Sequence, residues 1–439
     1  MAVTTRVSRR EFLRYAGGAA GAAAAFPHVV PSSALGKSGT TAPSNRVTVG
    51  CIGVGGMGTA DMNLMLALPD VQVVAVCDPK KPQRDAARQR VNAHYGKDVC
   101  AAYNDFRELV ARDDIDVVQV ASTDHWHVLH ALAAVRSGKD VYVEKPLGLS
   151  LREILTLREA CHRYSRLFQF GTQQRSMPQF RQACELVRNG RIGSLHTIKV
   201  SAPAGFPERT KEETYAPAPV PEGFDYEMWL GPAPWAPYTP KRVISPHWFH
   251  ISDYSLGYIA GWGIHHIDIA QWGNGTELSG PVEIEGSGVF PSNDGLCDNP
   301  LNWDVRMKYA NGVNMHFTSD GGPNTHGIRF EGTKGWIHVD RGRIIAEPAS
   351  LLQEKLEPGE IHLPVSTNHQ RNLIDCVKTR RQPICNIDIA VRSDTVCHLG
   401  WLAIHLGRKL RWDPAKEVFV DDPEANARMT RVMRSPWHL

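Results

Sequence analysis

Arg46-Val-Thr-Val-Gly-Cys-Ile-Gly-Val-Gly-Gly-Met-Gly58 is the stretch that decides the fold of this chain. Its residues up to Ile52 form an apolar, β-branched run typical of a buried strand, and a helix-like stretch begins at Thr59. A strand, the pattern G-x-G-x-x-G and a helix in this order are typical of a dinucleotide-binding turn. The glycines permit a tight turn, a close approach of backbone amides to a pyrophosphate, and close packing of the helix. The sequence therefore predicts a cofactor loop made of Gly53, Gly55, Gly56, Met57 and Gly58.

A carboxylate at the expected distance supports this reading. The next strand-like run, from Val71 to Val76, is followed by Asp78, which lies 20 positions after Gly58 (78 − 58). An acid at this spacing binds the ribose hydroxyls of the adenosine and repels a 2′-phosphate, which favours NAD over NADP. Lys80 and Lys81 follow closely, so NADP remains possible.

Strand and helix patterns continue to alternate after Asp78. Apolar runs at 115–121 and 140–143 read as strands, and 128–137 reads as a helix. Repeated strand–helix units predict a parallel sheet, whose ligands gather at the carboxyl ends of its strands. The residues that fall at such ends are the Gly53 loop, Asp78, Asp124, His125 and Lys145.

Lys145 is the candidate for chemistry within this set. A lysine at the end of a buried strand, beside a nicotinamide, would be partly desolvated and able to donate or accept a proton. The alternative is a surface lysine that is neutralised by Glu144.

The segment Glu144-Lys145-Pro146, after a strand and behind a dinucleotide fold, resembles the signature of the Gfo/Idh/MocA oxidoreductase family. The resemblance runs from about Arg46 to the C-terminus, and its later motifs are similar to an exported branch of the family. The other segments that carry it are Asp124-His-Trp-His127, Gly171-Thr-Gln-Gln-Arg175, Trp229-Leu-Gly-Pro-Ala-Pro-Trp235 and Gly263-Ile-His-His-Ile-Asp268.

This resemblance implies an α/β protein, in which an N-terminal Rossmann domain precedes an α+β domain with a large, mostly antiparallel open sheet. It also implies NAD(P) chemistry on a sugar, a polyol or a derivative, with Lys145 and His265 as the catalytic residues. The cofactor-binding set then extends to Thr123, Asp124, His125, His127, Glu144, Lys145 and Gln173. Substrate contacts are expected from Arg175, Trp248, Trp262, His266 and Asp268.

The chain departs from the family pattern at one position. Many relatives carry an aspartate four residues before the catalytic histidine, and here that position is Gly261. An aspartate there would orient the imidazole and support its positive form. Either another carboxylate such as Asp253 or Asp268 replaces it, or His265 matters less than Lys145.

The N-terminal residues resemble an export signal. Ser8-Arg-Arg-Glu-Phe-Leu13 is a twin-arginine run, an Ala/Gly-rich stretch follows, and Ser32-Ser-Ala34 offers small residues for cleavage. The predicted division is a signal peptide at 1–34, a linker at 35–45, a Rossmann domain at 46–168 and a substrate-binding and oligomerisation domain at 169–439. The expected partners are the twin-arginine export machinery and further copies of the chain in a homodimer or homotetramer, and the expected location is the periplasm.

Composition narrows the function classes further. The 439 residues carry 49 Lys and Arg against 46 Asp and Glu, and no basic stripe suggests nucleic-acid binding. Histidine pairs occur at His125-x-His127, His247-x-x-His250 and His265-His266, but their spacings match no closed zinc motif, so no metal is predicted.

The stretch from Pro203 to Pro246 is rich in proline, which excludes a regular helix or a central strand. Long irregular segments of this kind are binding loops or lids, and a rigid surface or contact loop is the alternative. Aromatic residues before His265 suit a sugar platform, with ordinary core packing as the alternative.

Three functions compete on this reading. The first is a sugar, polyol or glycoside oxidoreductase that holds and internally recycles its NAD, because an exported enzyme lacks a supply of free cofactor. The second is a redox-neutral, NAD-dependent glycosidase that passes through a transient keto-sugar. The third is a sugar-binding protein without catalysis.

Overall fold

The computed structural model describes residues 41–206, 216–291, 295–319 and 326–439. The predicted signal peptide and most of the predicted linker lie outside these residues. Residues 41–46 hold a short 3-10 turn, Pro43–Asn45, and are described separately from the compact unit Val47–Leu439.

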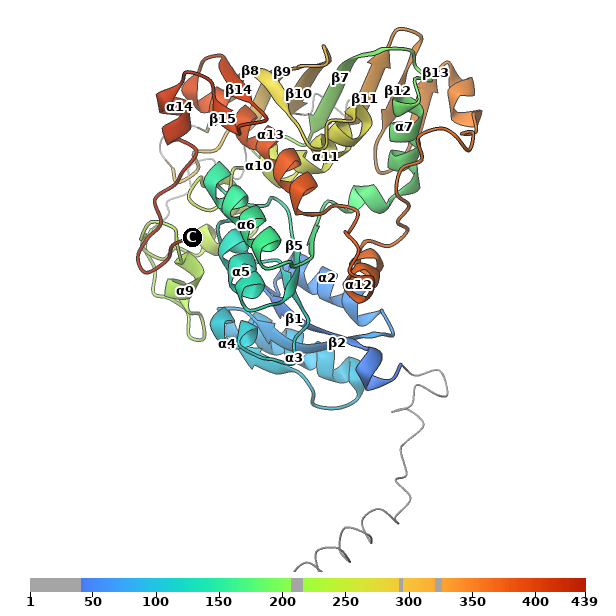
Figure 1. The fold of residues 1–439 in the computed structure, drawn as a ribbon. Helices are drawn as coiled ribbons and strands as arrows, with labels where there is room; N and C mark the ends of the chain where they lie inside the picture. The colour runs from blue at the N-terminus through green and yellow to red at the C-terminus, as the bar shows by residue number, and fades with distance from the viewer. Residues whose placement is uncertain (1–40, 207–215, 292–294, 320–325) are drawn as a thin grey trace, which may run out of the picture. The chain divides into compact units, whose positions relative to one another are not determined.

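The first half of the compact unit is a parallel sheet with helices on both faces (Figure 1). Residues 47–170 are described without a gap and contribute six strands in the order β3-β2-β1-β4-β5-β6. The strand order reverses between β1 and β4, and ligands of doubly wound sheets bind at such a switch point. The strands are β1 Val47–Ile52, β2 Val71–Cys77, β3 Ala101–Tyr103, β4 Val117–Val120, β5 Asp140–Val143 and β6 Phe168–Phe170. The helices are α2 Gly56–Leu66, α3 Lys81–Tyr95, α4 Phe106–Val110, α5 Asp124–Arg136 and α6 Leu151–Arg163.

The second half is built on a larger sheet. Within the described residues it has nine strands in the order β13-β12-β11-β7-β10-β9-β8-β14-β15. All its pairings are antiparallel except that of β7 with β10. The strands are β7 Leu195–Ala202, β8 Pro281–Val289, β9 Asn302–Tyr309, β10 Asn314–Ser319, β11 Gly327–Gly332, β12 Gly335–Val339, β13 Ile344–Glu347, β14 Leu410–Asp413 and β15 Val418–Phe419.

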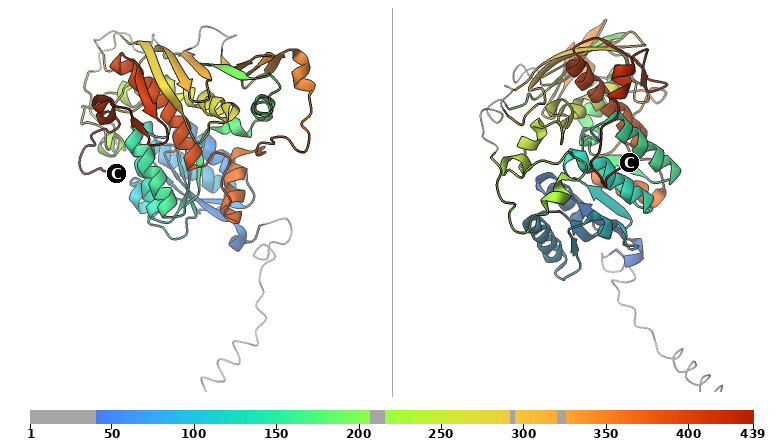
Figure 2. Two further views of the ribbon diagram at one scale, coloured as in Figure 1. Left: turned by 45° about the horizontal axis from the view of Figure 1, so that its top comes forward. Right: turned by 90° about the vertical axis from the view of Figure 1, so that its left-hand side faces the viewer.

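Helices pack on one face of this second sheet (Figure 2). The long helix α13 contacts β8 on one side and α6 and β6 on the other, so it lies between the two sheets. The opposite face carries charged side chains such as Lys199, Arg306 and Lys308. The α-helices are α7 Pro178–Arg188, α9 Tyr226–Leu230, α10 Tyr258–Gly261, α11 Gly263–Asn274, α12 His369–Thr379, α13 Ile387–Leu406 and α14 Pro423–Ala427. The 3-10 helices are η3 Gln173–Ser176, η4 Lys241–Val243, η5 His247–His250 and η6 Ala349–Gln353.

The predicted fold class is therefore confirmed: a Rossmann sheet is followed by a mixed, mostly antiparallel sheet. One continuous apolar core runs from the Rossmann strands into the second sheet and includes Val143, Phe170, Ile264 and Phe317. In the described part of the chain, no helix combines the length and the apolar character needed to cross a membrane.

Candidate functional site

The glycine loop has the geometry that its sequence predicts. Gly53 follows β1 with φ +79°, and a Cβ atom there would lie 2.5 Å from the backbone nitrogen of Ser122. A Cβ atom on Gly58 would lie 1.9 Å from the carbonyl oxygen of Gly53. Gly55 and Gly56, by contrast, open onto a cavity at the start of α2. Backbone amides at a helix N-terminus in such a loop are suited to a pyrophosphate.

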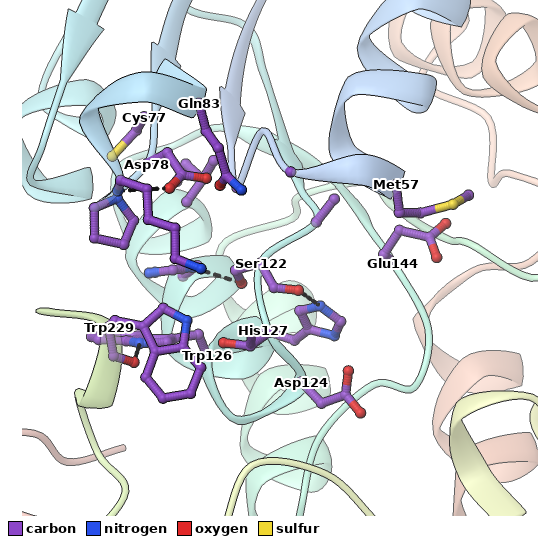
Figure 3. Close-up of a pocket in the computed structure, with 18 of the residues that line it drawn as sticks. Met57, Cys77, Asp78, Gln83, Ser122, Asp124, Trp126, His127, Glu144 and Trp229 are labelled. Carbon is purple, nitrogen blue, oxygen red and sulfur yellow. Dashed lines mark hydrogen bonds between the residues drawn. The ribbon is translucent and has the colours of Figure 1, made fainter. Parts of the chain in front are cut away.

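Asp78 lies at the end of β2 and is buried. Its carboxylate accepts hydrogen bonds from the backbone nitrogens of Val54, at 3.0 Å, and Lys80, at 2.9 Å. The Gln83 side-chain amide is placed to donate to it as well (Figure 3). Burial raises the pKa of Asp78, and the two backbone bonds oppose that shift. The carboxylate is thus fixed at one end of the cavity.

The two lysines that left NADP open are both engaged elsewhere. Lys80 donates from Nζ to the carbonyl oxygen of Val243 at 2.8 Å and lies over the ring of Phe224. Lys81 is exposed and pairs with Asp85. Among the described residues, neither side-chain amine bonds the carboxylate of Asp78.

A cavity of about 250 Å³ runs along the carboxyl ends of β1, β2, β4 and β5. Asp78 and Gln83 lie at one end of the view in Figure 3, and Met57 and Glu144 lie at the other. The predicted residues that line it are Gly53, Gly55, Gly56, Met57, Asp78, Thr123, Asp124, His127, Glu144, Lys145 and Trp248. The predicted residues that do not line it are Gly58, His125, Gln173, Arg175, Trp262, His265, His266 and Asp268.

Lys145 and Glu144 form the reactive end of the cavity. Lys145 donates from Nζ to the carbonyl oxygen of Gly261 at 2.9 Å. Glu144 accepts from the Tyr142 hydroxyl at 3.1 Å, and a Cβ on Gly171 would lie 2.3 Å from its Oε1 atom. The carboxylate therefore occupies space that only a glycine at 171 leaves open.

A second carboxyl group, that of Asp61, interacts electrostatically with Glu144. Asp61, on α2, is buried, and its Oδ2 atom has no hydrogen-bond partner among the described residues. Burial and the neighbouring Glu144 raise the pKa of Asp61 to about 9, and burial raises the pKa of Glu144. Two like charges this close cannot both ionise cheaply, so the pair holds a proton near neutral pH.

His265 lies on α11 behind the cavity wall. Its Nδ1 atom is buried and has no partner among the described residues. Burial first, and then the charge of Lys145, hold the pKa of His265 well below its ordinary value. A neutral imidazole of this kind can accept a proton from a substrate hydroxyl.

The structure explains the missing aspartate at position 261. A Cβ atom on Gly261 would lie 2.9 Å from Cε1 of Phe249, so the aromatic ring occupies the place of a side chain. Neither suggested substitute orients His265, because Asp253 lies 3.8 Å from Arg431 and Asp268 is bonded elsewhere. The backbone carbonyl of Gly261, rather than a carboxylate, meets Lys145.

The prediction that Arg175 and Asp268 contact substrate needs correction. They form a buried ion pair, 1% and 0% exposed, with Nε and Oδ2 2.6 Å apart. Glu277 and Ser393 complete this network. Buried charges are stable only when they are paired in this way, and none of these groups reaches the cavity.

Three residues that were predicted to bind the cofactor do not line the cavity. Gly58 packs against Gly53, and His125 contacts the carbonyl oxygen of Trp229 through Nε2 at 3.0 Å. Burial lowers the pKa of His125 to about 3, so it is neutral. Gln173 begins η3 and does not line the cavity.

The proline-rich stretch folds over the cavity as a cover, which we define as residues 216–250. It pairs with the loop after Asp78, because Lys81 donates to the carbonyl oxygen of Gly223 at 2.8 Å and Asp225 donates to that of Pro79 at 3.0 Å. The lid interpretation of this stretch therefore fits the structure. Five cavity residues of the cover were not predicted from sequence, namely Met228, Trp229, Val243, Ser245 and Phe249.

A later segment, residues 431–437, fastens the cover. Arg434 donates from its backbone nitrogen to Pro232 at 2.9 Å and from Nε to the carbonyl oxygen of Gly231 at 3.0 Å. Trp437 packs edge-on against Trp126, with ring centroids 4.7 Å apart. Trp126 itself lines the cavity, so this segment touches the cavity wall.

Within the described residues, no group of three histidine, cysteine, aspartate or glutamate side chains is placed to hold a metal ion.

Solved structures share this fold. An aldose-aldose oxidoreductase from Caulobacter crescentus, complexed with glycerol, has 18% identity and a TM-score of 0.61, and covers 83% of this chain and 99% of its own. A scyllo-inositol dehydrogenase from Lactobacillus casei, with bound NAD(H) and scyllo-inositol, has 16% identity and a TM-score of 0.60 at the same coverage. At these identities the likeness shows the fold alone.

Curated relatives match part of the chain. A glycosyl hydrolase family 109 protein of Saccharopolyspora erythraea is 40% identical over 114 residues, which is 25% of this chain and 25% of the relative. An alpha-N-acetylgalactosaminidase of Shewanella oneidensis is 31% identical over 203 residues, or 43% and 44%. The chain thus spans less than half the length of the curated relatives it matches.

Family models cover almost the whole compact unit. The NAD-binding Rossmann fold of the GFO/IDH/MocA oxidoreductase family matches residues 47–172. The C-terminal alpha/beta domain of the same family matches residues 177–439. Since the two matches follow one another along one continuous core, the chain belongs to the Gfo/Idh/MocA family of oxidoreductases.

Proposed function

We infer that the protein is an oxidoreductase that acts on a sugar, a polyol or a glycoside and keeps its NAD bound between turnovers. The observation that carries this proposal is the covered cavity, which joins a glycine loop and Asp78 to Lys145 and Glu144. NAD supplies a hydride acceptor when it is bound. Asp78 would bind the adenosine ribose hydroxyls, and the engaged positions of Lys80 and Lys81 favour NAD over NADP.

Residues of the chain itself can take up the proton that the substrate hydroxyl loses during oxidation. His265 is neutral, and its buried Nδ1 atom has no hydrogen-bond partner among the described residues, which supports a role as the acceptor of the substrate hydroxyl's proton. Lys145, held at the carbonyl of Gly261, would orient that hydroxyl and its oxygen. The Asp61–Glu144 pair keeps a proton close to the same end of the cavity. Trp248 and Phe249, whose rings stack at 3.9 Å, would exclude water.

Retention of the cofactor is the first expected result. Protein purified without added NAD should release nearly stoichiometric nicotinamide cofactor on denaturation, because the cover lines the cavity and residues 431–437 hold the cover in place. The double variant Arg434→Ala, Trp437→Ala removes the contacts to Gly231 and Trp126, and should lose NAD during dialysis. The measurement is the cofactor content of the denatured supernatant by chromatography.

A matched variant separates this effect from general damage. Arg411→Ala removes an exposed ion pair with Asp421 far from the cover and should keep the NAD content of the parent protein. Purified parent protein that is empty and needs millimolar NAD would overturn the proposal.

The second candidate is a redox-neutral glycosidase, favoured by the names of the curated relatives. In this version the substituent would leave by elimination, water would add in its place, and the hydride would return to the same sugar. A chromogenic α-N-acetylgalactosaminide should then be cleaved without net NADH, and a substrate deuterated at C3 should react more slowly. Net NADH formation without cleavage would contradict the glycosidase and support a dehydrogenase or an enzyme that transfers hydride between two sugars.

Location and assembly extend the proposal. The Ser8–Leu13 run supports export by the twin-arginine route to the periplasm, and a folded enzyme with retained NAD suits that route. The charged open face of the second sheet supports a homodimer or homotetramer through that face.

A further inference from the structure

Arg341 lies in the turn between β12 and β13, close to the reactive end of the cavity. Its guanidinium lies over the ring of Trp262, 4.8 Å from the centroid. Its Nε atom donates to Oε1 of Gln174 at 3.1 Å. An aromatic platform and one hydrogen bond therefore fix the plane of the guanidinium.

This arginine is connected to the catalytic residues on two sides. Trp262 directly follows Gly261, whose carbonyl oxygen accepts from Lys145. The Gln174 amide donates to the backbone oxygen of His265 at 3.2 Å. The charge of Arg341 also contributes to the lowered pKa of His265. The guanidinium thus lies within electrostatic reach of the reacting groups.

The outer edge of the guanidinium is open. In the described part of the chain, Nη1 and Nη2 of Arg341 make no ion pair or hydrogen bond, and the residue is exposed. Arg343, two positions later, pairs with Asp340 at 3.2 Å. Arg175, a buried arginine of the same half of the chain, binds both Asp268 and Glu277. The guanidinium of Arg341 is therefore held in place, while Nη1 and Nη2 are bonded to no carboxylate among the described residues.

The charged groups around the guanidinium of Arg341 leave its surroundings with a net positive charge. Glu144 is the acidic group that acts on Arg341, and burial raises the pKa of that carboxyl towards its neutral form. Asp340 is held by Arg343. Lys145 adds a positive charge on the side of His265.

Two unpartnered imidazole atoms lie beside the same tryptophan. His265 and His266 meet the ring of Trp262 edge-on, with centroids 5.5 and 4.8 Å away. The Nδ1 atom of His265 and the Nε2 atom of His266 are buried without a hydrogen-bond partner among the described residues. Burial keeps the pKa of both rings low, so they are neutral and add no positive charge beside Arg341.

We propose that the substrate is a sugar acid, whose carboxylate binds Nη1 and Nη2 of Arg341 while one of its hydroxyls meets Lys145. This assignment rests on the proposed oxidoreductase function and names its substrate class. An end-on pair of parallel hydrogen bonds between a guanidinium and a carboxylate is a strong and directional contact.

The test compares a charged probe with an uncharged probe of the same shape. The holoenzyme is titrated calorimetrically with D-glucuronate, D-galacturonate and D-mannuronate, and with the methyl ester of each. At least one acid should bind about 10- to 100-fold more tightly than its ester, the range of a charge-assisted hydrogen bond pair. Arg341→Gln should remove that difference, and Arg341→Lys should restore part of it. Arg343→Gln, on the same turn, should keep it.

Reduction of the retained NAD, followed at 340 nm in the same samples, separates the two proposals. Equal binding of acids and esters, no binding of any probe, or a preference that survives in Arg341→Gln would each overturn the carboxylate site. NAD reduction by neutral sugars alongside such a result would leave the oxidoreductase function standing. A preference for the acids that depends on Arg341, with no hydride transfer to any probe, would support the carboxylate site and count against the oxidoreductase function.

Discussion

Replacing Lys145 by Met is expected to slow hydride transfer by roughly 10²- to 10⁴-fold, the usual contribution of a positioned proton-transfer group. Methionine keeps most of the side-chain length and removes the amine that donates to the carbonyl oxygen of Gly261. The bound cofactor should remain, because the glycine loop and Asp78 are untouched. The measurement is a single-turnover reduction of retained NAD at 340 nm, with the cofactor content determined in parallel.

Lys416→Met is the control for the loss of a lysine. The Lys416 side chain is 78% exposed and its Nζ atom lies 3.6 Å from Oδ2 of Asp413, so its replacement should leave the rate unchanged. A Lys145→Met enzyme with the parental rate would remove Lys145 from the mechanism. A parent protein that binds sugars but never reduces its NAD would instead support the sugar-binding function without catalysis.

Replacing Gly58 by Ala is expected to abolish NAD binding. The added methyl group would lie 1.9 Å from the carbonyl oxygen of Gly53 and 2.9 Å from its carbonyl carbon, so backbone atoms must move apart. Moving α2 away from the loop displaces the amides that face the pyrophosphate. A loss of a few kcal/mol in this contact corresponds to about a hundredfold or more in affinity. Cofactor content after purification and affinity for added NAD measure the effect.

Gly359→Ala tests whether any glycine replacement has this result. A Cβ atom at Gly359 meets no atom within 4 Å, so this variant should retain NAD and its melting temperature. If circular dichroism shows that the Gly58 variant is unfolded, the close approach of Gly58 to the carbonyl group of Gly53 is required for folding of the domain as well as for NAD binding. A folded Gly58→Ala protein with the parental NAD content would contradict the geometry described for the loop.

The cofactor side of the site could be predicted from sequence because its signals are local. Gly53, Gly58 and Asp78 are tied to one strand–turn–helix unit and the strand that follows it. Fixed spacing along the chain therefore sets their positions in space. Asp78 lies at one end of the cavity as predicted, and it is bonded to the backbone of Val54 in the glycine loop.

The substrate side depends on contacts between distant residues, which spacing does not determine. Arg175 meets Asp268 across 93 positions, and a polar residue that completes a buried ion pair has the same appearance in sequence as one that binds a ligand. Gly261 is a similar case, since only the ring of Phe249 shows why no side chain is present there. Arg341 follows a strand that carries no motif, and its place beside Trp262 emerges only from the sheet.

The fastening of the cover sets an order of events during synthesis. Arg434 holds the carbonyl of Gly231 from 203 positions later in the chain. At ~5–20 residues per second, a ribosome needs roughly 10 to 40 seconds to make that interval. Throughout this time the glycine loop has been synthesised while its cover still lacks the contacts from Arg434. Residues 431–437 can dock only after this interval, so a nascent chain that binds a dinucleotide earlier does so with the cover unfastened.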